Sequence, residues 1–322
     1  LAVHLLTGLA LFWLASLIMK QYRRHCETSL PRAAETWLPL AVCAIWLVHP
    51  LNLTSVLYIV QRMTSLTALF TVLGLCFYMV GRSRLLERRS GWPWIFTGLF
   101  GFGALALLSK ENGVLLPGYM FILELVLFRF RSPERTLDRR VAAFFGVILL
   151  LPAVLVLLLA LQPGSLLGGY SGRDFTLAER VMTEARVLVF YLKQILVPSI
   201  SELGLYHDDI AISRGLLDPP ATLYAGLAIT LLLALGLALL RKMPLVSLGI
   251  LWFFWAHSLE STIIPLEIAH EHRNYLADFG IILAVGGALV KLPGKRLAPA
   301  LRIATPAIFL ILLSYTTWVR AG

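Results

Sequence analysis

Long apolar stretches separated by short polar loops are the feature that most constrains this chain. A membrane-spanning helix needs about 20 mainly apolar residues, and the stretch from Tyr58 to Val80 is long enough to qualify. Of the 322 residues, 58% are hydrophobic and 14% charged, whereas a soluble domain carries about 25% charged residues. The sequence therefore predicts an all-α, polytopic bundle of about ten transmembrane spans. The predicted spans are 1–19, 37–48, 58–80, 92–108, 115–128, 141–161, 221–240, 244–259, 277–290 and 303–319.

Basic residues fall in alternate loops between these spans. Five such loops hold 19 of the 28 Lys and Arg residues, namely 20–36, 81–91, 129–140, 241–243 and 291–302. Because cytoplasmic loops collect Lys and Arg, these loops are expected on the cytoplasmic side. The net charge of +10 is then explained by membrane topology, and no nucleic-acid partner is expected.

One long polar segment, residues 162–220, lies on the opposite, non-cytoplasmic side. Within it, apolar residues recur every three or four positions between Phe175 and Leu196, which is typical of one helix face. The stripe consists of Leu177, Val181, Ala185, Leu188, Leu192 and Ile195, and the other face of Glu179, Thr183, Arg186 and Lys193. We expect an amphipathic helix over 175–196 in the membrane interface, although a helix simply packed on the spans would show the same pattern.

Polar residues at the non-cytoplasmic ends of the spans form three clusters. The richest is Glu260–Leu276, the second runs from His49 to Arg62, and the third is Ser109–Asn112. Charges buried unpaired in lipid would cost several kcal/mol, so the clusters should lie at a membrane surface or in a wet cavity. On a helix, the richest cluster would place four polar residues on one face. These are Glu267, His270, Glu271 and Asn274.

Cations and carboxylates at a membrane surface suit chemistry on a lipid-linked phosphate. The phosphate leaving group needs cationic stabilisation, and an acceptor hydroxyl needs a base, usually a carboxylate or histidine. We expect Arg62, Lys110 and Arg273 to bind the donor phosphate, and Glu271 or Glu260 to activate the acceptor. The other expected pocket residues are His49, Glu111, His272 and Asn274. An ion-pair network that ties the spans together would use the same residues without any chemistry.

Other polar and thiol groups have simpler interpretations. His270 and His272 stand two residues apart and would not face one metal ion together, so neither a metal nor another cofactor is expected. Glu124 is expected to pair with Arg129 near the cytoplasmic side. The three cysteines, Cys26, Cys43 and Cys76, are widely spaced and predict no disulfide framework.

The order of the short motifs carries a resemblance to a known family. VHPLNLTSVLYIVQR is followed by ALLSKENG and then by HSLESTIIPLEIAHEHRNYL. This order resembles bacterial relatives of the transmembrane and tetratricopeptide-repeat-containing protein O-mannosyltransferases, which are GT-C glycosyltransferases. The resemblance covers nearly the whole chain and implies a GT-C-like fold.

The resemblance implies transfer of a sugar from a polyprenyl-phosphate donor to a hydroxyl acceptor, often protein Ser or Thr, although a glycan acceptor is also considered. It also implies a place in the bacterial inner membrane with the active site facing the periplasm. The family has one more span and an acidic loop before the point where this chain starts, and it continues into tetratricopeptide repeats. We therefore interpret residues 1–322 as a single membrane module of a longer protein.

Two alternatives remain open at this stage. A lipid-linked glycan polymerase or ligase would use similar cations with a pyrophosphate-linked carrier. A transporter would place its charges near the midplane of the membrane, whereas the polar clusters here lie at the ends of the predicted spans.

Overall fold

The computed structural model describes residues 1–25, 34–160, 168–204, 207, 209–291 and 297–322. Over these residues the chain is helical, without a β-strand, which confirms the predicted all-α class. The α-helices are α1 (Ala2–His25), α2 (Ala34–Leu47), α3 (Leu53–Leu57), α4 (Arg62–Leu86), α5 (Trp92–Phe96), α6 (Gly103–Ser109), α7 (Leu116–Leu123), α8 (Arg139–Ala160), α9 (Leu177–Leu196), α10 (Ala221–Ala238), α11 (Pro244–His257), α12 (Ala277–Lys291) and α13 (Leu297–Ala321).

Six helical stretches among the described residues are long and apolar enough to cross a membrane. A seventh would be the pair formed by α2 and the helical segment Pro50–Leu57, which is bent by 51° at the break between them. These helices are compatible with an integral membrane protein. Each predicted span overlaps a helix, but α11 is an apolar helix of only 14 residues.

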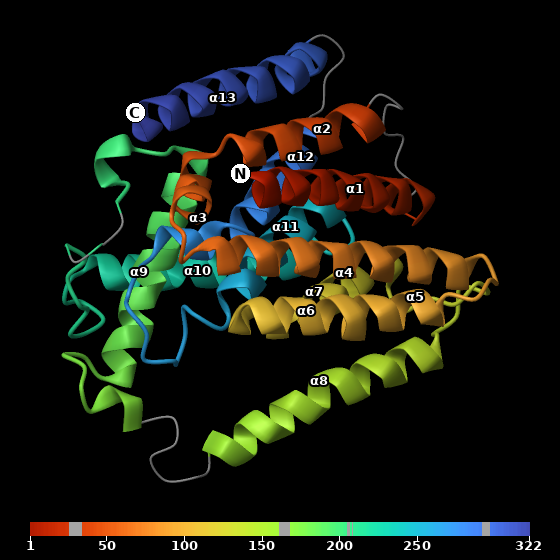
Figure 1. Ribbon diagram of the computed structural model, residues 1–322, viewed down its shortest axis with the longest axis horizontal. Coiled ribbons are helices and arrows are strands. Elements are labelled where there is room, and N and C mark those ends of the chain that lie inside the picture. The colour runs from red at the N-terminus through yellow and green to blue at the C-terminus, as the bar shows by residue number, and fades with distance from the viewer. Residues whose placement is uncertain (26–33, 161–167, 205–206, 208, 292–296) are drawn as a thin grey trace.

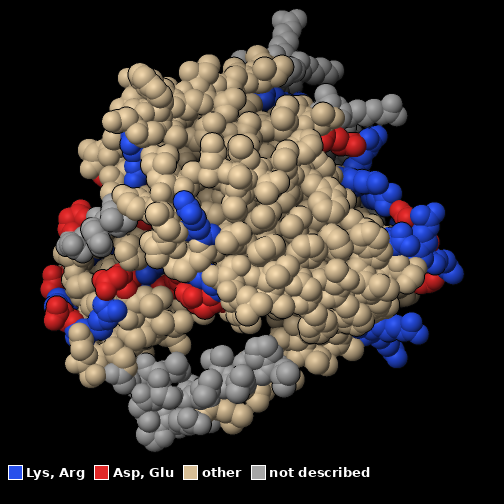
Figure 2. Space-filling model, in the orientation of Figure 1, with Lys and Arg blue, Asp and Glu red and all other residues tan. Residues whose placement is uncertain are grey.

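The helices form a bundle with two different ends (Figure 1). Most of them run side by side along the long axis, while α9 crosses their ends at one side of the molecule, where both termini also lie. We call this the α9 end. On the face seen in Figure 2, Lys and Arg gather at the opposite end, which we call the basic end, and a largely uncharged band separates the two ends. This arrangement matches the predicted alternation of basic loops.

The pair α11 and α12 positions the connecting segment 258–276, which holds the richest polar cluster. The two helices touch through glycines: a Cβ atom added at Gly249 would lie 2.1 Å from the carbonyl oxygen of Gly280. Trp252 on α11 donates its indole N–H to the carbonyl of Leu276 at 2.8 Å. The segment therefore leaves from and returns to a closely packed helix pair.

The expectation that Glu267, His270, Glu271 and Asn274 share one helix face is wrong. Segment 258–276 is largely irregular, with a short 3₁₀ turn over Glu271–Asn274. The physical reason is that Arg273 donates to the main-chain carbonyls of Glu267 and Ile268, which holds the chain in a loop.

Glu124 pairs with Arg82 of α4 rather than with Arg129. Arg82 Nε and Nη2 donate to the two carboxylate oxygens at 2.8 and 2.9 Å, and both side chains are fully buried. Arg129 instead ends its helix in the left-handed conformation, with φ 56°. Cys43 and Cys76 are buried free thiols, as expected, while Cys26 lies outside the described residues.

Candidate functional site

A buried ion pair between Lys110 and Glu260 forms the centre of the candidate site. Helix α6 stops at Ser109 because Lys110 is extended, with φ −162° and ψ 151°, and the next residues form a 3₁₀ turn. Lys110 Nζ donates to Glu260 Oε1 at 2.7 Å, with 4% and 6% of the side chains exposed. Burial alone would raise the pKa of Glu260, but the charges of Lys110 and Arg273 outweigh it and hold the pKa at about 2. Glu260 is therefore a carboxylate at neutral pH.

Arg273 is a second buried cation in the same region. Its Nη1 donates to Ile268 O at 2.9 Å and its Nη2 to Glu267 O at 2.7 Å. Its Nε atom is buried and has no hydrogen-bond partner among the described residues. A guanidinium with a free N–H in a buried position is suited to bind an oxyanion.

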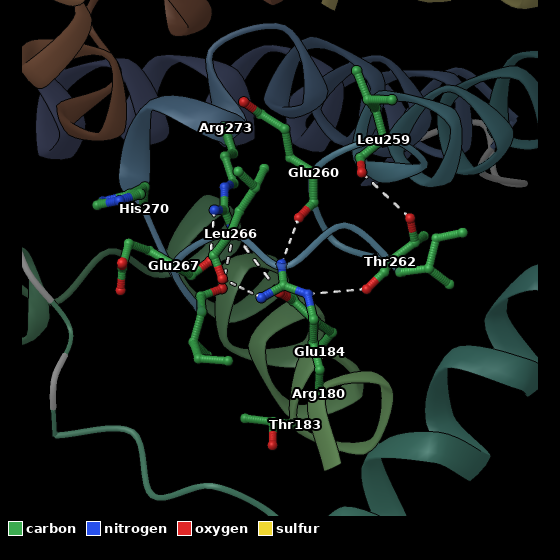
Figure 3. A network of polar contacts seen from close by, with 12 residues as sticks. Arg180, Thr183, Glu184, Leu259, Glu260, Thr262, Leu266, Glu267, His270 and Arg273 are labelled. Carbon is green, nitrogen blue, oxygen red and sulfur yellow. Dashed lines mark hydrogen bonds and ion pairs between the residues drawn. The ribbon is translucent and has the colours of Figure 1, made fainter. Parts of the chain in front are cut away.

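Helix α9 places a second charge pair, Arg180 and Glu184, against this region (Figure 3). Arg180 donates Nε to Thr262 O at 3.1 Å, Nη2 to Glu260 O at 2.9 Å, and Nη1 to Leu266 O. It also lies 2.9 Å from Glu184 Oε1, and Arg273 lies 3.8 Å from the same oxygen. The irregular segment 260–268 is thus held by two arginines that share one carboxylate.

The pKa values of Glu184 and Glu260 are shifted in opposite directions. Burial raises the pKa of Glu184 to about 7, more than the opposing effect of Arg273 and Arg180. Burial and the charge of Lys110 lower the pKa of His272 to about 3, so this imidazole is neutral at physiological pH. Two carboxyl groups with such different pKa values are typical of active sites in which one group stays ionised and the other gains and loses a proton.

A polar pocket lies beside the ion pair, with a cavity volume of about 40 Å³. Lys110, His272 and Arg273 line it together with a row of threonines on α4. The threonines are Thr64, Thr67 and Thr71. Asn112 and Tyr119 complete its polar lining. A pocket with two cations, neutral hydroxyls and an amide can bind an anion that also carries hydroxyl groups.

Three of the predicted site residues therefore line one pocket, and Glu260 binds one of them. Arg62 does not join them: it is exposed at the start of α4 and lines a separate cavity with Leu1–His4 and Ser55. Glu111 is exposed, whereas its neighbour Lys110 turns inward. The predicted group of three phosphate-binding cations thus contains two that share a pocket.

Glu271 belongs to a second network around α13. It accepts from Arg320 Nη2 and from the main-chain N–H of Gly204, both at 2.6 Å. Burial raises its pKa, more than Arg320 and Gly204 lower it. Asn274 is buried, with its Nδ2 donating to Glu271 O at 3.3 Å. Glu271 is absent from the residues that line the pocket with Lys110 and Arg273.

His49 holds the end of α9. Its Nε2 donates to the carbonyl of Ile195 at 3.0 Å, and its Nδ1 accepts from the main-chain N–H of Leu51. Both ring nitrogens are therefore used in hydrogen bonds within the protein. His49 therefore ties the break between α2 and α3 to α9, and it does not line the pocket as predicted.

Arg180 and Glu184 were missed from the sequence. The helix they lie on was predicted correctly, and a capping box of Thr176 and Glu179 starts it. The available signal was their i, i+4 spacing, which puts them on one face at the edge of the apolar stripe, beside Ile195. That face is buried against the protein, while Val181 of the stripe is 48% exposed.

We also searched for metal-ligand groups and compared the chain with known proteins. No group of three or more His, Cys, Asp or Glu suited to a metal ion occurs in the described part of the chain. His270 and His272 stack on each other, with ring centroids 5.0 Å apart. No protein-family model matches the chain, and no curated protein or solved structure matches it either.

Proposed function

We propose that this chain is a membrane glycosyltransferase module of GT-C type with about ten spans. It would transfer a sugar from a polyprenyl-phosphate donor to a hydroxyl acceptor, with protein Ser or Thr as the first candidate. The site would face the periplasm of a bacterial inner membrane, because the basic end corresponds to the cytoplasmic side. The observation that carries the proposal is the pocket at the α9 end, where Lys110 and Arg273 meet neutral polar groups.

The charge arrangement supports binding of a lipid phosphate. Lys110 and Arg273 come from segments far apart in the chain, yet both line one pocket. Both are almost fully buried, so their charges act in a low dielectric, where they stabilise developing negative charge more strongly than in water. The apolar helices beneath the pocket would accommodate the polyprenyl chain.

Glu260 is the predicted acceptor-activating carboxylate that lies beside these cations. It is deprotonated at neutral pH and hydrogen-bonded to Lys110. When the donor phosphate takes over Lys110, Glu260 would be released to accept a proton from the hydroxyl. Glu271, the other predicted base, is bound to Arg320, which does not line the pocket, whereas Glu260 is bound to Lys110, which does; this favours Glu260.

The test is transfer of labelled sugar from undecaprenyl-phosphate-linked sugar by the full-length protein in proteoliposomes. Removing Lys110 alone would leave Glu260 buried and unpaired, which destabilises the fold. The double variant Lys110→Met with Glu260→Gln avoids this, because it replaces a buried pair by neutral groups of similar size. We expect it to lower kcat/KM at least about 100-fold, the loss typical of a removed oxyanion donor.

The matched control is a second ion pair at the basic end. Arg88 Nη2 lies 2.6 Å from Glu134 Oε1, with both side chains exposed. Arg88→Met with Glu134→Gln should leave transfer unchanged. Full activity of the Lys110 and Glu260 double variant would refute the assigned roles. Use of a pyrophosphate-linked donor instead would favour a glycan polymerase or ligase.

A further inference from the structure

Three residues that line the pocket each carry a buried polar atom without a hydrogen-bond partner. These atoms are Thr71 Oγ1, Asn112 Oδ1 and Arg273 Nε. Buried polar atoms in proteins nearly always have a partner. Three unsatisfied atoms on residues that line one pocket, within the part of the chain that is described, therefore indicate a ligand that supplies the missing partners.

Of the three threonines on α4, two have a hydroxyl that donates a hydrogen bond within the described part of the protein and one does not. Thr64 donates to Gln61 Oε1 at 3.0 Å, and Thr67 donates to Ala106 O at 3.1 Å. Thr71 lies on the same helix face, is 1% exposed, and its hydroxyl has no such partner. The hydroxyl furthest along α4 from Arg62 is thus the one left for a bound molecule.

Asn112 is fixed so that its oxygen is available. The Asn112 side chain lies next to the carboxylate of Glu260 and lowers its pKa, and only the amide N–H group can donate to a carboxylate. Its Oδ1 is the acceptor without a partner. This acceptor requires an O–H or N–H donor from the ligand.

The three atoms together define the chemistry of the ligand. Arg273 Nε donates to an oxyanion, Asn112 Oδ1 accepts from a hydroxyl, and Thr71 Oγ1 can do either. We propose that Thr71 and Asn112 form the subsite for the sugar of the donor, next to its phosphate on Lys110 and Arg273. This inference rests on the proposed function, and it assigns sugar recognition to Thr71, which lies outside the predicted clusters, and to Asn112 of the third cluster, for which no role was predicted.

The proposal makes an unusual prediction for Thr71→Val, which removes the hydroxyl and keeps the side-chain shape. The variant should raise the melting temperature of the ligand-free protein, because an unsatisfied buried hydroxyl destabilises it. It should weaken binding of the sugar-bearing lipid about fivefold, which is the change in affinity expected from the loss of one neutral hydrogen bond. Thr67→Val is the matched control and should lower the melting temperature, because its hydroxyl has a partner.

Binding is measured in nanodiscs with two probes, undecaprenyl phosphate alone and undecaprenyl phosphate carrying one mannose, glucose or galactose. Thr71→Val should lose affinity for the best sugar-bearing lipid and keep its affinity for bare undecaprenyl phosphate, and Thr71→Ser should restore the loss. Equal loss for both lipids, no loss for either, or a lowered melting temperature overturns the sugar subsite alone. Failure of the wild-type protein to bind either lipid overturns the proposed function together with the subsite.

Discussion

The role of Arg180 can be tested through stability, independently of any substrate. Arg180→Met removes three hydrogen bonds to main-chain carbonyls of the irregular segment. Hydrogen bonds from a charged donor contribute about 1.5–3 kcal/mol each when measured singly. Neighbouring losses overlap, and the variant also leaves Glu184 with only the more distant Arg273. Breaking a buried pair costs about 3–5 kcal/mol, so we expect a loss of about 4 kcal/mol in unfolding free energy when stability is measured above the Glu184 pKa of about 7, where this group is ionised.

A double-mutant cycle separates the charge contribution from the hydrogen bonds. Glu184→Met with Arg180→Met removes both members of the pair, so no carboxylate is left buried without its partner. The double variant should therefore be more stable than the sum of the two single variants predicts, by about 2 kcal/mol. Unfolding is followed by SDS titration from mixed micelles, and hydrogen exchange reports on segment 259–268.

The control is Arg186→Met on the same helix. Arg186 Nη1 donates to Ala211 O at 2.7 Å and lies 3.3 Å from Ser213 Oγ, so it does not contact segment 259–268 in these bonds. It should cost about 1 kcal/mol and leave exchange in 259–268 unchanged. Equal destabilisation by Arg180→Met and Arg186→Met, or unchanged exchange in both, would show that α9 does not hold the segment.

Two further predictions concern the electrostatics and the packing. The native protein binds a proton at Glu184 up to pH of about 7, whereas the unfolded chain releases it near 4.5, so this group should lower stability by about 3 kcal/mol as pH rises between those values. Glu184→Gln should remove that slope in denaturation measured from pH 4.5 to 7.5, and an unchanged slope would contradict the shift. Gly249→Ala should destabilise the protein by more than 2 kcal/mol, because its Cβ would lie 2.1 Å from Gly280 O. Gly226→Ala on α10, where a Cβ meets nothing within 4 Å, should stabilise by about 1 kcal/mol, and similar effects of both would contradict the close contact.

The local sequence pattern was enough to predict the helices, but not which other segments they pack against. Apolar length and the spacing of the stripe are properties of adjacent residues, and α9 was found at nearly the predicted bounds. Which face of α9 the protein buries depends on the carbonyls of Glu260, Thr262 and Leu266, which lie 80 to 86 positions away from Arg180. No periodicity within α9 contains that information.

For the same reason, only some of the predicted charged residues meet in one pocket. Lys110 and Glu260 are 150 positions apart, and their pairing depends on the span break that turns Lys110 inward. Glu271 was a reasonable candidate base until Arg320, 49 positions further along, was found on its carboxylate. The sequence identified residue types that can bind phosphate, but only the fold decides which of them already have a partner.

The two pocket cations are held by different means, and this has a consequence for mechanism. Lys110 is fixed by the rigid end of a helix and by one carboxylate. Arg273 belongs to a loop whose shape depends on its own carbonyl contacts and on Arg180 of α9. The separation of the two cations is therefore set by how α9 lies across the bundle end. Ile195 of the apolar stripe is buried and Leu188 and Leu192 pack against the core, whereas Val181 is 48% exposed. Packing against the other helices therefore fixes α9, and with it the geometry of the candidate site.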